Sequence, residues 1–147
     1  MPHATSANIT ERYGDDYLLV IADRDDDDFV DSDAVDLALS DATEHINGHL
    51  AARYDLPLAS VPAVLVRLCV DIACYWLGQD GFGGSELRRQ RFDDANKTLE
   101  KIAAGKIVLL VGDTDGDGTE DEAGPKSEGA LITSETRLFS RTTLSGF

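Results

Sequence analysis

Apolar residues recur at helical spacing in three long segments, and this pattern restricts the chain to a helical fold. The first stripe lies in residues 32–54 and comprises Val35, Leu39, Ala42, Ile46 and Leu50. Successive members are three or four positions apart, as one face of an α-helix requires. Aspartates crowd the start of the segment, where exposed amides and the positive end of the helix dipole favour them. We therefore expect a first long helix over about 32–54 that ends before Pro57.

Two further segments repeat the pattern. Pro62 opens the second, at the first-turn position that proline favours, and its apolar positions are Leu65, Val66, Leu68, Cys69, Val70, Ile72, Ala73 and Trp76. Because this is the most apolar segment, we expect it at the centre of the fold. Ser85 can cap the third helix, which extends to about Ala104, and Gly105 occupies the position of a left-handed cap. Its inward positions are predicted to be Leu87, Phe92, Ala95, Leu99 and Ile102.

The remaining chain adds small elements around these helices. Residues 8–22 predict two short helices broken at Gly14, and residues 107–111 form a single apolar β-prone run with no second strand in sight. Such a run needs an edge from another chain, or it must pack in extended form. The predicted fold class is all-α: a small antiparallel helical bundle with a short β-prone run and an extended C-terminal arm. We divide it into a bundle (1–106), the run with an acidic linker (107–130) and the arm (131–147).

The net charge of the chain limits the kinds of molecule that it can bind. The chain has 28 acidic and 13 basic residues, a formal charge of −15, which disfavours direct binding to nucleic acid or to an anionic membrane surface. It contains no apolar run of transmembrane length and no signal peptide, so we expect a soluble protein made in a cytoplasm. Acidic residues concentrate in 1–36 and basic residues in 84–106. This segregation favours head-to-tail neighbours that can close into a ring.

Candidate metal ligands lie in two acidic loops. Asp113, Asp115, Asp117 and Asp121 have the alternating spacing of a calcium loop, with Gly118 at the sixth position but no glutamate at the twelfth. These residues predict at most weak calcium binding, against a solvated linker as the alternative. The earlier loop has Asp23, Asp25, Asp27 and Asp31 at the same offsets, with Asp28 where glycine is expected. Helix capping and solubility are the alternative roles of that loop.

Other reactive residue types form no convincing site. Asp41, His45 and His49 share one helical face, but no second ligand group follows, and a surface histidine pair explains them better than zinc. Cys69 and Cys74 point apart on one helix and are interpreted as small buried hydrophobic residues. The sequence has no nucleophile motif, P-loop or Rossmann fingerprint. We therefore predict that the chain is not an enzyme.

The last seventeen residues carry large apolar groups on a segment too short to bury them. They include Leu138, Phe139, Leu144 and Phe147. Each would contribute about 1.5–3 kcal/mol when buried, but ordering each residue costs about 1–2 kcal/mol. One arm alone should therefore bind weakly, whereas many arms on one assembly bind cooperatively. The alternative is that the arm packs back on its own bundle.

Several stretches are more specific than helical periodicity requires, above all Arg53-Tyr-Asp-Leu-Pro-Leu58 and Val61-Pro-Ala-Val-Leu65. Others are Ile9-Thr-Glu-Arg-Tyr-Gly-Asp15, Ala22-Asp-Arg-Asp25, Asp71-Ile-Ala73, Ile102-Ala-Ala-Gly-Lys106, Arg137-Leu-Phe-Ser-Arg141 and Gly146-Phe147. Together these stretches resemble the family of Mu-like phage head–tail connector, or neck, proteins. The family's acidic loop often reads Asp-x-Asp-Gly-Asp-Gly, and here Asp26 and Asp28 replace the glycines.

The resemblance implies a structural protein of the virion neck, without enzymatic activity, that forms a dodecameric ring beneath the portal. Its implied partners are the portal protein, a tail or stopper protein and further copies of itself, while DNA passes through the channel without specific binding. The arm then becomes the portal anchor, with Arg137, Leu138, Phe139, Arg141, Leu144 and Phe147 as portal-binding residues. Two alternatives remain open: an acidic mimic of DNA, and a calcium-binding interaction module.

Overall fold

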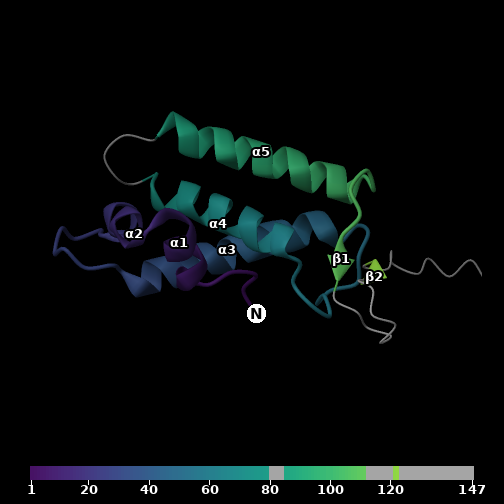
Figure 1. Cartoon of the computed structure of the whole chain (residues 1–147), viewed down its shortest axis with the longest axis horizontal. Helices are drawn as coiled ribbons and strands as arrows, with labels where there is room; N and C mark the ends of the chain where they lie inside the picture. The colour runs from purple at the N-terminus through teal and green to yellow at the C-terminus, as the bar shows by residue number, and fades with distance from the viewer. Residues whose placement is uncertain (80–84, 112–120, 123–147) are drawn as a thin grey trace, which may run out of the picture.

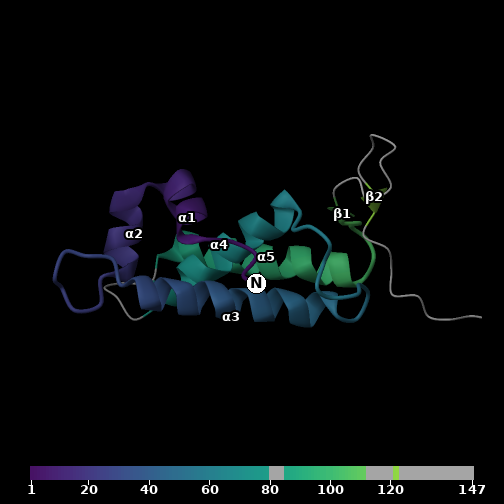
Figure 2. The ribbon, with the colours of Figure 1, turned by 90° about the horizontal axis from the view of Figure 1, so that it is seen from below.

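The computed structural model describes residues 1–79, 85–111 and 121–122. Three long helices form its body: α3 (Ser32–Leu50), α4 (Ala63–Leu77) and α5 (Glu86–Ala103). They run antiparallel to their sequence neighbours and contact one another pairwise. Two short helices, α1 (Ser6–Tyr13) and α2 (Asp15–Ala22), cover one end of this bundle (Figures 1 and 2). The all-α class and the helical bundle are confirmed.

The centre of the fold is α4, as its composition predicted. It contacts all four other helices, and nine of its residues are buried, against three in α5. Pro62 precedes α4, and its carbonyl oxygen accepts the amides of Leu65 and Val66. A proline suits this position because it has no N–H to satisfy and its fixed φ matches the helix.

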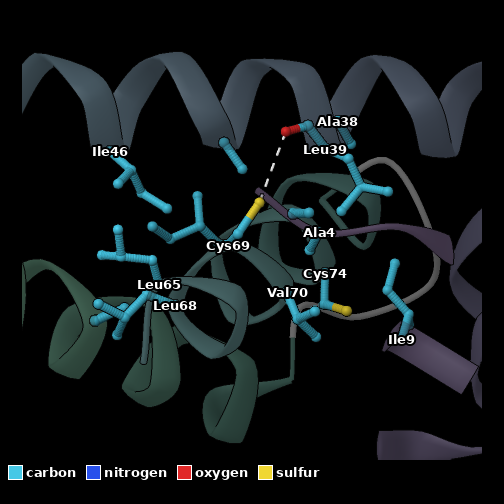
Figure 3. Close-up of a cluster of buried hydrophobic side chains, with 14 of the residues drawn as sticks. Ala4, Ile9, Ala38, Leu39, Ile46, Leu65, Leu68, Cys69, Val70 and Cys74 are labelled. Atoms are coloured by element: carbon cyan, nitrogen blue, oxygen red, sulfur yellow. Dashed lines mark hydrogen bonds between the residues drawn. The ribbon is translucent and has the colours of Figure 1, made fainter. Parts of the chain in front are cut away.

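The predicted α3 stripe is buried along its whole length, and it packs against α4 through the cluster in Figure 3. Cys69 lies in this cluster with its Sγ 3.7 Å from the Leu39 carbonyl oxygen. Cys74 is buried too, and both thiols are free. The prediction that both cysteines are small core residues is confirmed.

Two boundaries in the bundle differ from the expectation. Helix α3 ends at Leu50, not near Tyr54, because the chain turns at residues 51–53 so that Tyr54 enters the core. There the Tyr54 hydroxyl accepts a hydrogen bond from the Leu109 amide at 3.4 Å. Leu87 was predicted to face inward but is 53% exposed. It lies in the first turn of α5, about 80° around the helix from the buried Ala95 at 100° per residue, so its side chain falls outside the buried face.

The expectation of a lone strand is wrong. Leu110–Val111 (β1) pairs antiparallel with Asp121–Glu122 (β2) of the same chain, and Leu110 lies opposite Glu122 (Figure 1). The partner was missed because β2 is acidic and has no apolar alternation, so only the backbone bonds of the ladder identify it. Leu109 and Val111 also join the bundle core. None of the helices in the described ranges is long and apolar enough to cross a membrane.

Gly105 ends α5 in the predicted left-handed conformation, with φ of +71°. A Cβ at this position would meet the Arg53 guanidinium group. We expect Gly105→Ala to lower the free energy of unfolding by about 1–2 kcal/mol, because alanine is strained in this conformation. Urea denaturation followed by circular dichroism measures the change.

Gly48 provides the matched control for this substitution. It lies within α3, and nothing stands within 4 Å of the position its Cβ would take. Gly48→Ala should therefore raise stability by up to about 1 kcal/mol, because alanine restricts the unfolded chain and favours a helix. Equal effects of the two substitutions would contradict the role given to the Gly105 backbone.

Candidate interaction surfaces

The acidic loop between α2 and α3, residues 23–31, projects from one end of the bundle (Figures 1 and 2). The Asp23 carboxylate organises it by accepting the backbone amides of Asp26, Asp27 and Asp28 at 2.8–3.2 Å. The Asp31 amide closes the base of the loop by donating to the Ala22 carbonyl oxygen at 2.9 Å. Hydrogen bonds to a charged acceptor are the stronger kind. The loop therefore has a defined backbone conformation despite its density of charge.

Two aspartates in this loop adopt the left-handed conformation that glycine prefers. Asp26 has φ of +62° and Asp28 has φ of +64°. These are the positions at which the resembling family often has glycine. Aspartate is among the few residues that enter this region with a modest penalty. The loop thus keeps the backbone path of a glycine-containing loop while adding two carboxylates.

Asp28→Gly should therefore raise the free energy of unfolding by about 1 kcal/mol, since glycine removes the left-handed strain. Asp25→Gly is the control, because it removes the same charge from the same loop at a residue without a positive φ. Thermal or urea unfolding distinguishes the two variants. An equal gain in the free energy of unfolding for both variants would mean that the lost charge, and not the backbone conformation, causes the stabilisation.

Three carboxylates of this loop lie close enough to face one cation. The ligand oxygens of Asp23, Asp25 and Asp27 lie within 4.8 Å of one another. The pKa of Asp25 is raised, chiefly by the charge of Asp27 and to a lesser degree by Asp31 and Asp23. Protonation, salt or a cation would relieve this repulsion. Calcium binding by the loop stays a prediction.

The loop preferred from sequence as a calcium site lies mostly outside the described residues. Asp113, Asp115 and Asp117 lie outside the described residues, and Asp121 is placed only as part of β2. The predicted portal-binding residues of the arm also lie outside the described ranges. Their assignments therefore remain predictions.

The histidines of α3 belong to a half-buried aromatic cluster between α3, α4 and α5. The His45 ring meets the His49 ring edge-on at 5.1 Å and the Trp76 ring at 5.7 Å, measured between centroids. His45 Nε2 donates to the Asn96 side-chain oxygen at 2.7 Å. Because this nitrogen is already engaged in holding α3 to α5, the cluster favours a packing role over metal ligation. The structure places Asp41 on the surface.

A buried polar network joins α1 to α4, and sequence reasoning did not identify it. Asp71 is only 7% exposed and accepts a hydrogen bond from the Tyr13 hydroxyl at 2.5 Å. The exposed Arg67 lies one helical turn away, with Nε 3.8 Å from the Asp71 carboxylate. The Arg91 guanidinium of α5 lies over the Tyr13 ring at 4.7 Å. An aspartate within the most apolar segment was the signal that could have indicated this site.

Burial makes two groups near this network hard to ionise. It raises the pKa of Tyr13, as does the hydrogen bond to Asp71, and it raises the pKa of Cys74 to about 12. Since both folded pKa values exceed the unfolded ones, the folded state favours the neutral forms. These two groups therefore contribute to the free energy of unfolding. The contribution is fully present below the unfolded pKa of 9.0 for cysteine and 10.0 for tyrosine, and it is lost as pH rises further.

We therefore expect the urea midpoint to fall markedly between about pH 8 and about pH 11. A Tyr13→Phe/Cys74→Ala double variant, which lacks both titrating groups, should show a shallower fall. Unfolding curves at the two pH values measure the difference. An identical fall in wild type and variant would assign the alkaline loss to other groups.

A groove of about 360 Å³ lies beside the acidic loop. Its described lining combines apolar residues of α2 with carboxylates of the loop: Leu19, Val20, Ile21, Asp23, Asp26 and Asp28. Arg88 of α5 also lines the groove and adds one cation to it. Val20 is 77% exposed, and Phe29 in the loop is 71% exposed. This end of the bundle thus presents apolar side chains within a strongly negative field, as surfaces that bind partners often do.

Together, the helical core and these surfaces define a small helical bundle whose candidate sites are surfaces for binding. The model of the family described as Bacteriophage Mu, Gp36 matches residues 3–127, so the chain belongs to that family. It is 34% identical over 145 residues to the Mu-like prophage FluMu protein gp36 of Haemophilus influenzae, covering 99% of this chain and 97% of that protein. It is 32% identical over 144 residues to gene product J of Escherichia phage Mu, covering 96% of each. This is a Mu-like phage protein.

Proposed function

We propose that this Mu-like phage protein is a structural head–tail connector without enzymatic activity, located in the neck of the virion. Its copies form a ring, and the C-terminal arm of each copy attaches the ring to the portal. The ring then provides the surface on which a tail or stopper protein assembles. Family membership with relatives of phage and prophage origin supports this role at the level of a phage protein.

The observation that carries the proposal is that the described residues as far as Val111 form one hydrophobic core among themselves. Buried hydrophobic side chains extend from Ala4 to Val111 and form one cluster across all five helices. Residues 131–147, which contain Leu138, Phe139, Leu144 and Phe147, lie outside the described residues. We propose that the arm uses these apolar groups to bind the portal, since each would contribute about 1.5–3 kcal/mol when buried.

The strong negative charge suits a ring through which DNA passes. A channel wall that lacks clustered cations cannot release counterions from the phosphate backbone, so it does not hold the DNA. On α3 the exposed charged residues are acidic, namely Asp33, Asp36, Asp41 and Glu44. A surface of this kind can face the channel without retaining the passing duplex.

The direct experiment mixes the purified full-length chain with rings of its cognate portal protein and images the particles by negative stain. We expect an added layer on one face of the portal and cosedimentation of the two proteins. Particles that stay unchanged at saturating concentration, with all of the chain left in the supernatant, would contradict the connector role. A bovine serum albumin sample of equal concentration controls for non-specific pelleting.

A further inference from the structure

We propose that the groove beside the acidic loop holds residues 137–147 of the same chain until the arm meets its partner. The regulatory meaning of this contact rests on the proposed connector function, whereas the contact itself does not. The occupant is a segment outside the described residues, and three features favour it: its charge, its apolar content and its reach.

Charge and apolarity are complementary between the groove and the arm. The arm contains Arg137-Leu-Phe-Ser-Arg141, two cations that flank two large apolar residues. The groove offers carboxylates next to an apolar surface, since Asp26 and Asp28 line it together with the exposed Val20. Three aspartates and one arginine, Arg88, line the groove, so the net charge of its lining is opposite to that of the arm's arginines. Oppositely charged rims around an apolar contact direct binding and fix its register.

The arm can reach the groove within one molecule. The last described strand, β2, lies at the end of the bundle opposite the acidic loop (Figures 1 and 2). The 19 residues of α3 cover about 28 Å of the distance between these ends at 1.5 Å per residue, and the loop and β2 lie a little beyond the two ends of this helix (Figure 2). Residues 123–136 can extend to about 46 Å. The linker is therefore long enough to return the arm along the bundle.

Weak binding is sufficient to keep the arm in the groove, and this contact protects the free subunit. A tethered segment experiences an effective concentration in the millimolar range, so modest affinity keeps the groove occupied. Occupation covers apolar side chains that would otherwise promote aggregation of free subunits. When many arms bind one portal together, their combined avidity exceeds the affinity of each arm for its own groove. The contact therefore restrains the arm before assembly without preventing assembly.

Limited trypsin digestion of the full-length chain tests the contact, because trypsin cleaves after Arg137 and Arg141. Initial cleavage at these sites, followed by mass spectrometry, should be slow in wild type and rise about fivefold in Asp26→Asn/Asp28→Asn, since proteolysis follows the population of the released arm. Asparagine also tolerates the left-handed backbone at both positions, so the loop keeps its conformation. The control Asp113→Asn/Asp115→Asn removes two charges from the linker and should cleave like wild type.

A second pair of variants tests the apolar half of the groove. Val20→Ser should release the arm, whereas Val61→Ser, at an exposed valine away from the groove lining, should not. Equal cleavage in both variants and wild type would overturn the proposal. Protection that grows with protein concentration would also overturn it, in favour of capture by a second copy.

Portal binding separates this inference from the proposed function. If the arm is unprotected but the full-length chain binds portals, the groove contact is wrong and the connector role stands. If the arm is protected but portals are not bound, the contact stands and its regulatory meaning is lost.

Discussion

Deleting residues 131–147 should leave a folded bundle that no longer attaches to portal rings. Among the described residues the core cluster extends from Ala4 to Val111, so we expect the free energy of unfolding to fall by no more than about 1 kcal/mol, which is the contribution of an arm held in the groove. Apparent affinity for the portal should fall at least about 100-fold, because the loss is multiplied over all the arms that act together in one ring. Cosedimentation and urea unfolding of the same preparation measure the two quantities.

Two smaller variants refine this test. Phe139→Ala/Phe147→Ala removes apolar contact area while keeping the length and charge of the arm, and it should reproduce most of the loss. Thr142→Ala/Thr143→Ala changes two residues of the same arm and should bind normally. Intact attachment of the truncated chain would show that another part of the molecule docks on the portal.

Asp71→Ala should be the most destabilising of the single substitutions considered for the bundle, at about 2–4 kcal/mol. It leaves the half-buried Tyr13 hydroxyl without the acceptor that lies 2.5 Å away, and it breaks the hydrogen bond that joins α1 to α4. The loss of a hydrogen bond to a charged group and the orphaned hydroxyl both contribute. Urea denaturation at neutral pH provides the value.

A double-mutant cycle shows whether the effect arises from this pair. Tyr13→Phe alone should cost about 1 kcal/mol, and the double variant should cost less than the sum of the single ones by about 1–2 kcal/mol. Asp94→Ala is the matched control, because Asp94 is exposed and its ion pair with Lys97 contributes little. Additive effects of Tyr13→Phe and Asp71→Ala would refute the coupling.

Helical periodicity was sufficient to predict the body of the fold. The stripe of α3, the central position of α4, the break at Gly14 and the left-handed cap at Gly105 all follow from spacing and backbone preference. These features are local, because a residue three or four positions away is a neighbour on any helix. The apolar positions of α5 were also predicted, except Leu87, which lies about 80° around the helix from Ala95 and is exposed.

The candidate site was less accessible from the sequence. The spacing of Asp23, Asp25 and Asp27 was recognised, but their approach within 4.8 Å goes with a loop in which Asp26 is left-handed and its amide donates to Asp23. Residue spacing does not reveal this backbone path. The histidine pair was expected on the surface, whereas the structure places His45 between Trp76 and Asn96. For His45 the missing information is which distant segment lies opposite, and no local pattern contains it.

The sequence by itself determined the number, order and inward faces of the long helices. A helix with one apolar stripe can bury that stripe only by turning it towards the core. The tertiary structure alone decided which polar groups meet: Tyr13 with Asp71, His45 with Asn96, and β1 with β2. The physical reason is that hydrophobic burial is non-directional and can be predicted from periodicity. A hydrogen bond instead requires two atoms at about 3 Å, a distance that only the completed packing sets.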